Sequence, residues 1–174
     1  MRRLILLRHA KSDWPPAVAD LERPLAARGR AEAPAIGDFM IREGLRPDLA
    51  LVSPARRARE TWTLVAAAFP ELPPHQTDPR LYMATADALL DVVRAARADA
   101  TLLILGHNPG LEEFARTLVG RGNAEARKRL AGSFPTAALA VIEFAADDWA
   151  ELLPQQEGTL VHFVTPRSLG ARQN

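Results

Sequence analysis

Three short runs of apolar residues, spread along the chain, constrain its fold more than any other feature. They are Leu4–Leu7, Leu49–Val52 and Leu102–Leu105, and such unbroken hydrophobicity is typical of strands buried on both faces. Segments with helical periodicity alternate with these runs, at residues 25–43, 53–69, 86–97 and 111–119. Alternating strands and helices favour a mostly parallel sheet with helices on both faces. We therefore expect an α/β protein, a single-domain three-layer α/β/α sandwich.

The ends of these elements carry local signals of their own. Ser53-Pro54 and Asn108-Pro109 are each predicted to be the N-cap and first residue of a helix. Residues 70–79 are rich in proline and predicted to be irregular. The last third of the chain is predicted to add strands, some of them antiparallel, which would make the sheet mixed: residues 138–144, 149–153 and 159–164.

Composition limits the classes of protein to which this chain can belong. Its 174 residues are 48% hydrophobic, which is enough for one domain, residues 1–174, with a core of its own. The chain has no cysteine, which excludes disulfides, a thiol nucleophile and Cys-ligated metals. A formal net charge of +1 argues against nucleic-acid binding, and no apolar stretch approaches the roughly 20 residues of a membrane span. We expect a cytoplasmic monomer that binds neither nucleic acids nor membranes.

Polar residues follow each of the three predicted strands. Arg8-His9 follows the first, Ser53 and then Arg57 follow the second, and His107 follows the third. Ligands of open α/β sheets bind at the carboxyl ends of the strands, so we expect these side chains to converge. Arginine binds phosphate oxygens with a planar fork, and a neutral imidazole can attack phosphorus. The pattern indicates phosphoryl chemistry, and the absence of a G-x-x-x-x-G-K-[ST] loop argues against ATP-dependent transfer.

The residues around these positions resemble three motifs of a known family. Leu7–Ser12 resembles the Arg-His-Gly signature of the histidine phosphatase superfamily, also called phosphoglycerate mutase-like. Ser53–Thr61 resembles its second motif and Gly106–Asn108 its third, in the same order and with similar spacing over residues 1 to about 120. The short chain, Ala10 in place of the usual glycine and the sequence Gly106–Gly110 resemble the SixA-type phosphohistidine phosphatases most closely.

The resemblance implies a phosphoglycerate mutase-like fold and a role for each matching residue. His9 would be the nucleophile that becomes phosphorylated, and Arg8, Arg57 and His107 would bind the phosphoryl group. No metal or organic cofactor is implied. The partner would be a phosphohistidine-bearing protein, such as a phosphocarrier or a histidine-phosphotransfer domain. Two further residues of the motifs are expected to contact the phosphoryl group, namely Ser12 and Asn108.

The sequence departs from larger family members at the general acid. These members carry a glutamate between the second and third motifs, whereas residues 78–87 offer no clear counterpart here. Asp13, Asp78 and Asp87 remain candidates for the role. An alkoxide leaving group needs a proton in the transition state, but a phosphorylated imidazole can carry one on its other nitrogen near neutral pH. The pattern therefore favours phosphohistidine, with a small-molecule phosphomonoesterase or a catalytically silent phosphoprotein-binding module as alternatives.

The remaining histidines and arginines near the motifs match no functional pattern. His75 and His162 are interpreted as polar positions in a loop and a strand, without metal-ligand spacing. Arg56 and Arg59 are expected on the surface of a helix. Trp14, in the loop after the first motif, is either a packing residue of a lid or a platform for substrate.

Overall fold

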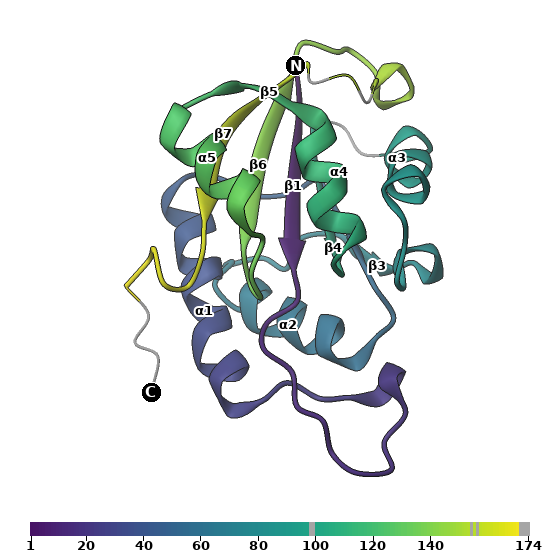
Figure 1. Cartoon of the computed structure of the whole chain (residues 1–174), viewed down its shortest axis with the longest axis vertical. Coiled ribbons are helices and arrows are strands. Elements are labelled where there is room, and N and C mark those ends of the chain that lie inside the picture. Colours follow the sequence, from purple (N-terminus) through teal and green to yellow (C-terminus); the bar gives the residue numbers. More distant parts are fainter. Residues whose placement is uncertain (98–99, 154, 156, 171–174) are drawn as a thin grey trace.

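A computed structural model describes residues 1–97, 100–153, 155 and 157–170, so the predicted domain boundary at residue 174 lies outside the described residues. Within the described part of the chain, seven strands form one mixed sheet in the order β3-β2-β4-β1-β6-β7-β5. Figure 1 shows β1 in the middle of this sheet. The strand bounds are β1 Arg2–Arg8, β2 Leu49–Val52, β3 His75–Thr77, β4 Thr101–Gly106, β5 Val119–Gly122, β6 Leu139–Phe144 and β7 Gly158–Val164.

The central strand β1 separates a parallel half of the sheet from a half that contains the antiparallel pairs. On one side β1 pairs in parallel with β4, which pairs in parallel with β2 and so with β3. On the other side β1 pairs antiparallel with β6, which pairs antiparallel with β7. Strand β5 adds a further parallel pair at that edge. The predicted mixed, mostly parallel sheet is confirmed.

Helices cover both faces of the sheet, which confirms the three-layer α/β/α sandwich (Figure 1). Ile5 and Leu7 of β1 pack on the face covered by α1 (Ala27–Arg42) and α2 (Arg56–Ala66). Leu4 and Leu6 pack on the opposite face, because side chains alternate along a strand. The helices on that face are α3 Ala86–Arg94, α4 Gly110–Leu118 and α5 Ala124–Gly132.

The sheet is the middle layer of the sandwich, and its central strands are fully buried. Leu4, Leu6, Leu102 and Leu103 have no exposed surface. Burying a leucine side chain contributes about 1.5–3 kcal/mol, so this layer holds the carboxyl ends of the strands in a rigid frame.

No helix among the described residues is long and apolar enough to cross a membrane.

The glycines of α1 are required by close packing between backbones. A Cβ atom on Gly29 would lie 2.2 Å from the carbonyl oxygen of Lys11, and one on Gly37 would lie 2.4 Å from that of Val65. Glycine therefore lets the first turn of α1 contact the loop that follows β1, and lets its third turn contact α2. These contacts explain why a helix forms here although two glycines and Pro34 weaken its sequence pattern.

Two predicted elements in the loops are wrong. Residues 149–153 do not form a strand, because the Asp148 side chain accepts a hydrogen bond from the Ala150 amide and begins a short 3₁₀ helix, η3 (Trp149–Glu151). Residues 70–79 are not irregular throughout, because the short edge strand β3 pairs with β2. Two more 3₁₀ helices are present, η1 (Asp20–Glu22) and η2 (Pro79–Leu81).

The predicted N-caps Ser53 and Asn108 are also wrong. Helix α2 begins at Arg56 after Ala55, and α4 begins at Gly110 after Pro109. The Ser53 hydroxyl bonds to His107 and accepts from the Ala55 amide at 3.3 Å, and the Asn108 amide donates to the Phe134 carbonyl oxygen. Neither side chain accepts a hydrogen bond from an amide within the helix that follows it.

Candidate active site

The four motif residues converge on one cavity of about 520 Å³ at the carboxyl ends of the parallel strands. Arg8 is the last residue of β1 and His9 follows it, while Arg57 lies in the first turn of α2, just after β2. His107 directly follows β4. Because β1 and β4 are parallel and in register at Arg8 and Gly106, His9 and His107 leave the sheet side by side. Their ring centres are 5.2 Å apart.

The surroundings of His9 determine which ring nitrogen is free. Its Nδ1 lies 2.8 Å from the carbonyl oxygen of Ala10, which can only accept a hydrogen bond, so Nδ1 carries the proton. In the neutral ring this leaves a lone pair on Nε2. Burial, followed by the positive charges nearby, lowers the pKa of His9 to about 3. His9 is therefore neutral at physiological pH, with Nε2 available as a nucleophile.

His107 is held in the opposite tautomer. Its Nε2 lies 2.6 Å from the Ser53 hydroxyl, and its Nδ1 lies 3.4 Å from Nη2 of Arg57. Arginine can only donate, so Nδ1 accepts and Nε2 donates to Ser53. Burial, followed by the charge of Arg57, lowers the pKa of His107 to about 4. A phosphoryl dianion beside the ring would favour its protonated form, which can donate from Nδ1.

The two arginines retain donors that no described residue uses. Nη1 of Arg57 donates to the Asp20 carbonyl oxygen at 2.7 Å, and Nη1 of Arg8 donates to that of Phe134 at 3.1 Å. The Nε atoms of Arg8 and Arg57 are buried without a hydrogen-bond partner among the described residues. Burial lowers the pKa of Arg8, but a guanidinium stays charged. Unpaired buried donors of this kind need an acceptor, and an oxyanion would supply one.

Thr61 links the segment that carries His9 to the helix that carries Arg57. Its hydroxyl accepts from the Ala10 amide at 3.0 Å and donates to the Arg57 carbonyl oxygen at 2.7 Å. The side chain is fully buried. This connection gives a physical role to the threonine at the end of the second motif.

Sequence reasoning missed Asp20, Arg23 and Tyr82 on the far wall of the cavity. The Asp20 carboxylate accepts hydrogen bonds from Arg57 at 3.1 Å, from Arg23 at 2.9 Å and from the Tyr82 hydroxyl. These donors, with Tyr82 first, hold the pKa of Asp20 well below its usual range. The spacing of Asp20 and Arg23, which form an i,i+3 pair, is the one signal in the sequence that could have indicated this cluster.

Arg23 organises the loop between β1 and α1. It donates to the Ser12 hydroxyl at 2.7 Å and to the Asp13 carbonyl oxygen at 3.0 Å. Its guanidinium carbon lies 3.2 Å from the centre of the Trp14 ring, which is itself 73% exposed at the cavity. The Trp14 ring thus covers the Arg23 guanidinium, and most of the Trp14 side chain stays exposed to solvent.

Ser12 and Asn108 line the cavity as expected, but both are bonded to protein groups. Ser12 accepts from Arg23, and the Asn108 amide donates to the Phe134 carbonyl oxygen at 2.8 Å. Their contact with a phosphoryl group stays a prediction.

The three aspartates considered as general acids do not line the cavity. Asp13 and Asp87 are exposed. Asp78 is buried, and hydrogen bonds from Arg80 lower its pKa. Asp20 is the one carboxylate that lines the cavity within the described chain, and its lowered pKa keeps it ionised at neutral pH. The described part of the site therefore holds no protonated carboxyl group.

The structure places the remaining residues much as expected. Arg56 and Arg59 are exposed on α2. His162 lies in β7, while His75 lies in the edge strand β3 and not in a loop. Among the described residues no group of three or more histidine, aspartate or glutamate side chains could hold a metal ion.

Comparison with known proteins assigns the chain to a family. The family model for the histidine phosphatase superfamily (branch 1) matches residues 4–82. An uncharacterized protein of Mycobacterium leprae is 35% identical over 167 residues, covering 92% of this chain and 100% of the relative. The crystal structure of the candidate phosphohistidine phosphatase SixA from Agrobacterium tumefaciens is 30% identical, with a TM-score of 0.79 over 95% of this chain and 98% of that one. The chain belongs to the histidine phosphatase superfamily.

A further solved structure supports the fold of this histidine phosphatase. The protein histidine phosphatase SixA complexed with tungstate has a TM-score of 0.74 over 96% of this chain and 99% of that one, at 20% identity. The phosphoglycerate mutase-like fold predicted from the motifs is confirmed. Membership of the superfamily supports phosphatase activity, and hence a hydrolase.

Proposed function

We propose that this histidine phosphatase hydrolyses phosphohistidine on a protein, such as a phosphocarrier or a histidine-phosphotransfer domain. The observation that carries the proposal is a neutral, buried His9 among cationic donors, in a cavity without a protonated carboxyl group among the described residues. Such a site supplies a nucleophile and a positive field, but its described residues include no carboxylic acid that could protonate an alkoxide.

In the first step, Nε2 of His9 attacks phosphorus while the bond from phosphorus to the substrate's imidazole breaks. The electron pair of that bond stays on the departing nitrogen. The substrate ring carries a proton on its other nitrogen near neutral pH, so it departs as neutral imidazole. The charge of the transferring group would be stabilised by Arg8 and Arg57, which line the cavity and whose buried Nε donors have no partner among the described residues.

In the second step, water attacks phosphorus and His9 departs. Nδ1 of His9 stays protonated because it donates to the Ala10 carbonyl oxygen at 2.8 Å. The phosphorylated ring is therefore cationic, and it departs as the same neutral tautomer that began the cycle. The phosphate is released as H₂PO₄⁻, which carries both protons of the water, and it then gives one of them to solvent as it ionises. The same hydrogen bond thus serves both half-reactions without an external acid.

Steady-state kinetics on three substrates would test the proposal. A phosphohistidine peptide, para-nitrophenyl phosphate and phosphoserine differ in how much their leaving groups need a proton. We expect kcat/KM to be lower for phosphoserine than for the phosphohistidine peptide by about 10²- to 10⁴-fold, the usual value of a general acid. Comparable values for the two would contradict the phosphohistidine preference and favour a small-molecule phosphomonoesterase. Binding without turnover of any of the three would indicate a silent binding module.

A further inference from the structure

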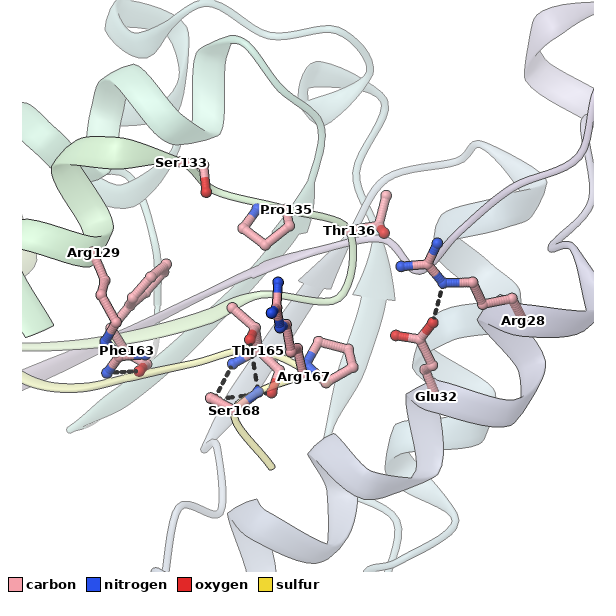
Figure 2. A pocket seen from close by; sticks show the side chains of 11 residues that line it. Arg28, Glu32, Arg129, Ser133, Pro135, Thr136, Phe163, Thr165, Arg167 and Ser168 are labelled. Carbon is pink, nitrogen blue, oxygen red and sulfur yellow. Dashed lines mark hydrogen bonds and ion pairs between the residues drawn. The ribbon is translucent and has the colours of Figure 1, made fainter. Parts of the chain in front are cut away.

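A second cavity, of about 660 Å³, lies beside the catalytic one. Its walls come from the first turns of α1, the segment between α5 and β6, and the segment after β7 (Figure 2). Thr136 lines both cavities. Figure 2 shows Arg28 extending from α1 toward Thr136, and Arg167 extending from the C-terminal segment toward Pro135.

The charges that line this second cavity are mostly positive. Three arginines, Arg28, Arg129 and Arg167, face one acidic residue, Glu32. Glu32 is only 5% exposed, and its carboxylate accepts a hydrogen bond from Arg28. Among the described residues, neither Arg129 nor Arg167 forms an ion pair with a carboxylate. The described lining therefore keeps a positive charge that its own residues do not neutralise.

Of the two unpaired arginines, Arg129 is held by a backbone carbonyl oxygen, and Arg167 lies in a turn that its neighbours stabilise. Nη2 of Arg129 donates to the Phe163 carbonyl oxygen at 2.9 Å. Arg167 lies in a turn that Thr165 and Ser168 close from both ends. The Thr165 amide donates to the Ser168 hydroxyl at 2.8 Å, and the Ser168 amide donates to the Thr165 hydroxyl at 3.0 Å. Because this turn is preorganised, little conformational freedom of the backbone is lost when a ligand contacts Arg167.

The wall between the two cavities is bonded directly to the catalytic residues. The Ala137 amide donates to the His9 carbonyl oxygen at 3.0 Å, and the Phe134 carbonyl oxygen accepts from Arg8 at 3.1 Å. On the other side, Gly29 of α1 packs against the Lys11 carbonyl. Because Thr136 lines both cavities, an extended ligand with its phosphoryl group at His9 would have to cross this residue to reach the arginines of the second cavity.

We propose that this second cavity binds a carboxylate-rich segment of the protein substrate, next to its phosphohistidine. This inference rests on the proposed function, because it assumes that the substrate is a protein. Guanidinium groups bind carboxylates in a forked geometry, and three of them from separate elements are spread around a cavity that is larger than the catalytic one. Arg28, Arg129 and Arg167 are exposed. Exposed arginines of this kind fit the binding of several carboxylates on an extended chain better than the binding of a single desolvated phosphate.

Two synthetic phosphohistidine peptides of equal length would test the proposal. One carries glutamates on both sides of the phosphohistidine, and the other carries glutamines at the same positions. At low ionic strength we expect the wild-type protein to prefer the glutamate peptide by about five- to tenfold in kcat/KM. Arg167→Glu should abolish this preference. Because the readout is a ratio of two substrates, a general loss of activity or stability does not affect it.

Arg46→Glu is the matched control. Arg46 is exposed beyond the end of α1, lines neither the catalytic nor the second cavity, and the substitution changes net charge by the same amount. We expect this variant to keep the wild-type ratio. A wild-type ratio near one, or an unchanged ratio in Arg167→Glu, would overturn the inference.

Binding of the same peptides without phosphate separates this inference from the proposed function. Calorimetry should show tighter binding of the glutamate peptide, weakened by Arg167→Glu and not by Arg46→Glu. If para-nitrophenyl phosphate is hydrolysed and neither phosphopeptide is, the proposed function fails, and this binding difference alone decides whether the second cavity recognises carboxylates. Equal binding of the two peptides would then refute it.

Discussion

The catalytic cavity has a strand-end wall, formed by Arg8, His9, Arg57 and His107, and a loop wall, formed by Ser12, Trp14, Asp20, Arg23 and Tyr82. On the strand-end wall, the backbone sets the positions of the side chains, because β1 and β4 are paired in register up to Arg8 and Gly106. On the loop wall, side chains hold one another, with Asp20 accepting from Arg23 and Tyr82.

This difference indicates how each wall responds to substitution. A side chain removed from the strand-end wall leaves the buried sheet in place, so the loss is local and chemical. A side chain removed from the loop wall takes away a hydrogen-bond partner from several neighbours, so the effects of nearby substitutions will not be additive.

The largest expected effect comes from removing His9, the proposed nucleophile. His9→Ala should lower kcat on para-nitrophenyl phosphate by at least about 10³-fold, because no covalent intermediate can form. Circular dichroism should show an unchanged fold, since the sheet around position 9 remains. Wild-type turnover by the purified variant would show that the strand-end wall does not carry the chemistry.

The next largest effect is expected from Arg57, and the neighbouring Arg56 on α2 serves as its control. Arg57 is buried at the cavity, whereas Arg56 is exposed and pairs with Glu60 at 3.3 Å. Arg57→Ala should lower kcat/KM by about 10²- to 10³-fold, the usual loss for one preorganised donor, and Arg56→Ala should leave it unchanged. Equal losses in the two variants would mean that the overall charge of the helix matters and not the position of Arg57.

The buried histidines of the strand-end wall should make stability depend on pH. Their pKa values, about 3 for His9 and about 4 for His107, lie below the ordinary 6.5. At pH values between these lowered pKa values and 6.5, the unfolded chain therefore binds more protons than the folded protein. The free energy of unfolding then falls as the pH drops below about 6.5. From pH 7 to pH 5 each histidine should cost about 2 kcal/mol in the free energy of unfolding.

Urea unfolding at both pH values would measure this loss. His9→Gln and His107→Gln should each reduce it, and the exposed His75→Gln is the control for removing a histidine as such. A wild-type protein with the same unfolding free energy at pH 7 and pH 5 would show that these rings are not held neutral.

The smallest effect concerns the loop wall. The Asp20 carboxylate bonds to Nη2 of Arg57 and places a negative charge where an anionic ligand must bind. Asp20→Asn keeps an acceptor for Arg57 but removes that charge, and should tighten inhibition by orthovanadate about three- to fivefold. Glu22→Gln, in the same short 3₁₀ helix but outside the cavity, should have no effect. Weaker inhibition of Asp20→Asn would mean that the carboxylate serves mainly to position Arg57.

The strand-end wall could be predicted from the sequence because its residues directly follow strands that the hydrophobic pattern reveals. Apolar runs such as Leu4–Leu7 and Leu102–Leu105 indicate buried parallel strands, and parallel strands place whatever follows them at one edge. These two facts were enough to predict that His9 and His107 lie close together. The motif resemblance then predicted which residues bind and attack the phosphoryl group.

The loop wall and several shorter elements could not be predicted in this way. Asp20 and Tyr82 are 62 positions apart and meet only because the loop folds back across the cavity. Helix α5 and strand β5 were not predicted, since α5 buries only Ala126 and Leu130 and so has little apolar periodicity. Ser53 was taken for a helix cap because local sequence cannot show that His107, far along the chain, is its partner.

The antiparallel pairing of β6 with β1 has a consequence for how specificity can change in this fold. A strand that runs opposite to β1 begins at the edge where β1 ends, so the segment before β6 reaches the catalytic residues from outside the parallel half. It contributes Thr136 and the Ala137 amide, and none of the four motif residues. The Phe134 carbonyl oxygen and the Ala137 amide of this segment also bond to Arg8 and to the His9 backbone. A change of the Thr136 side chain can therefore alter the approach of a substrate, whereas an insertion or deletion between Ser133 and Ala137 would also move the groups that hold Arg8 and His9.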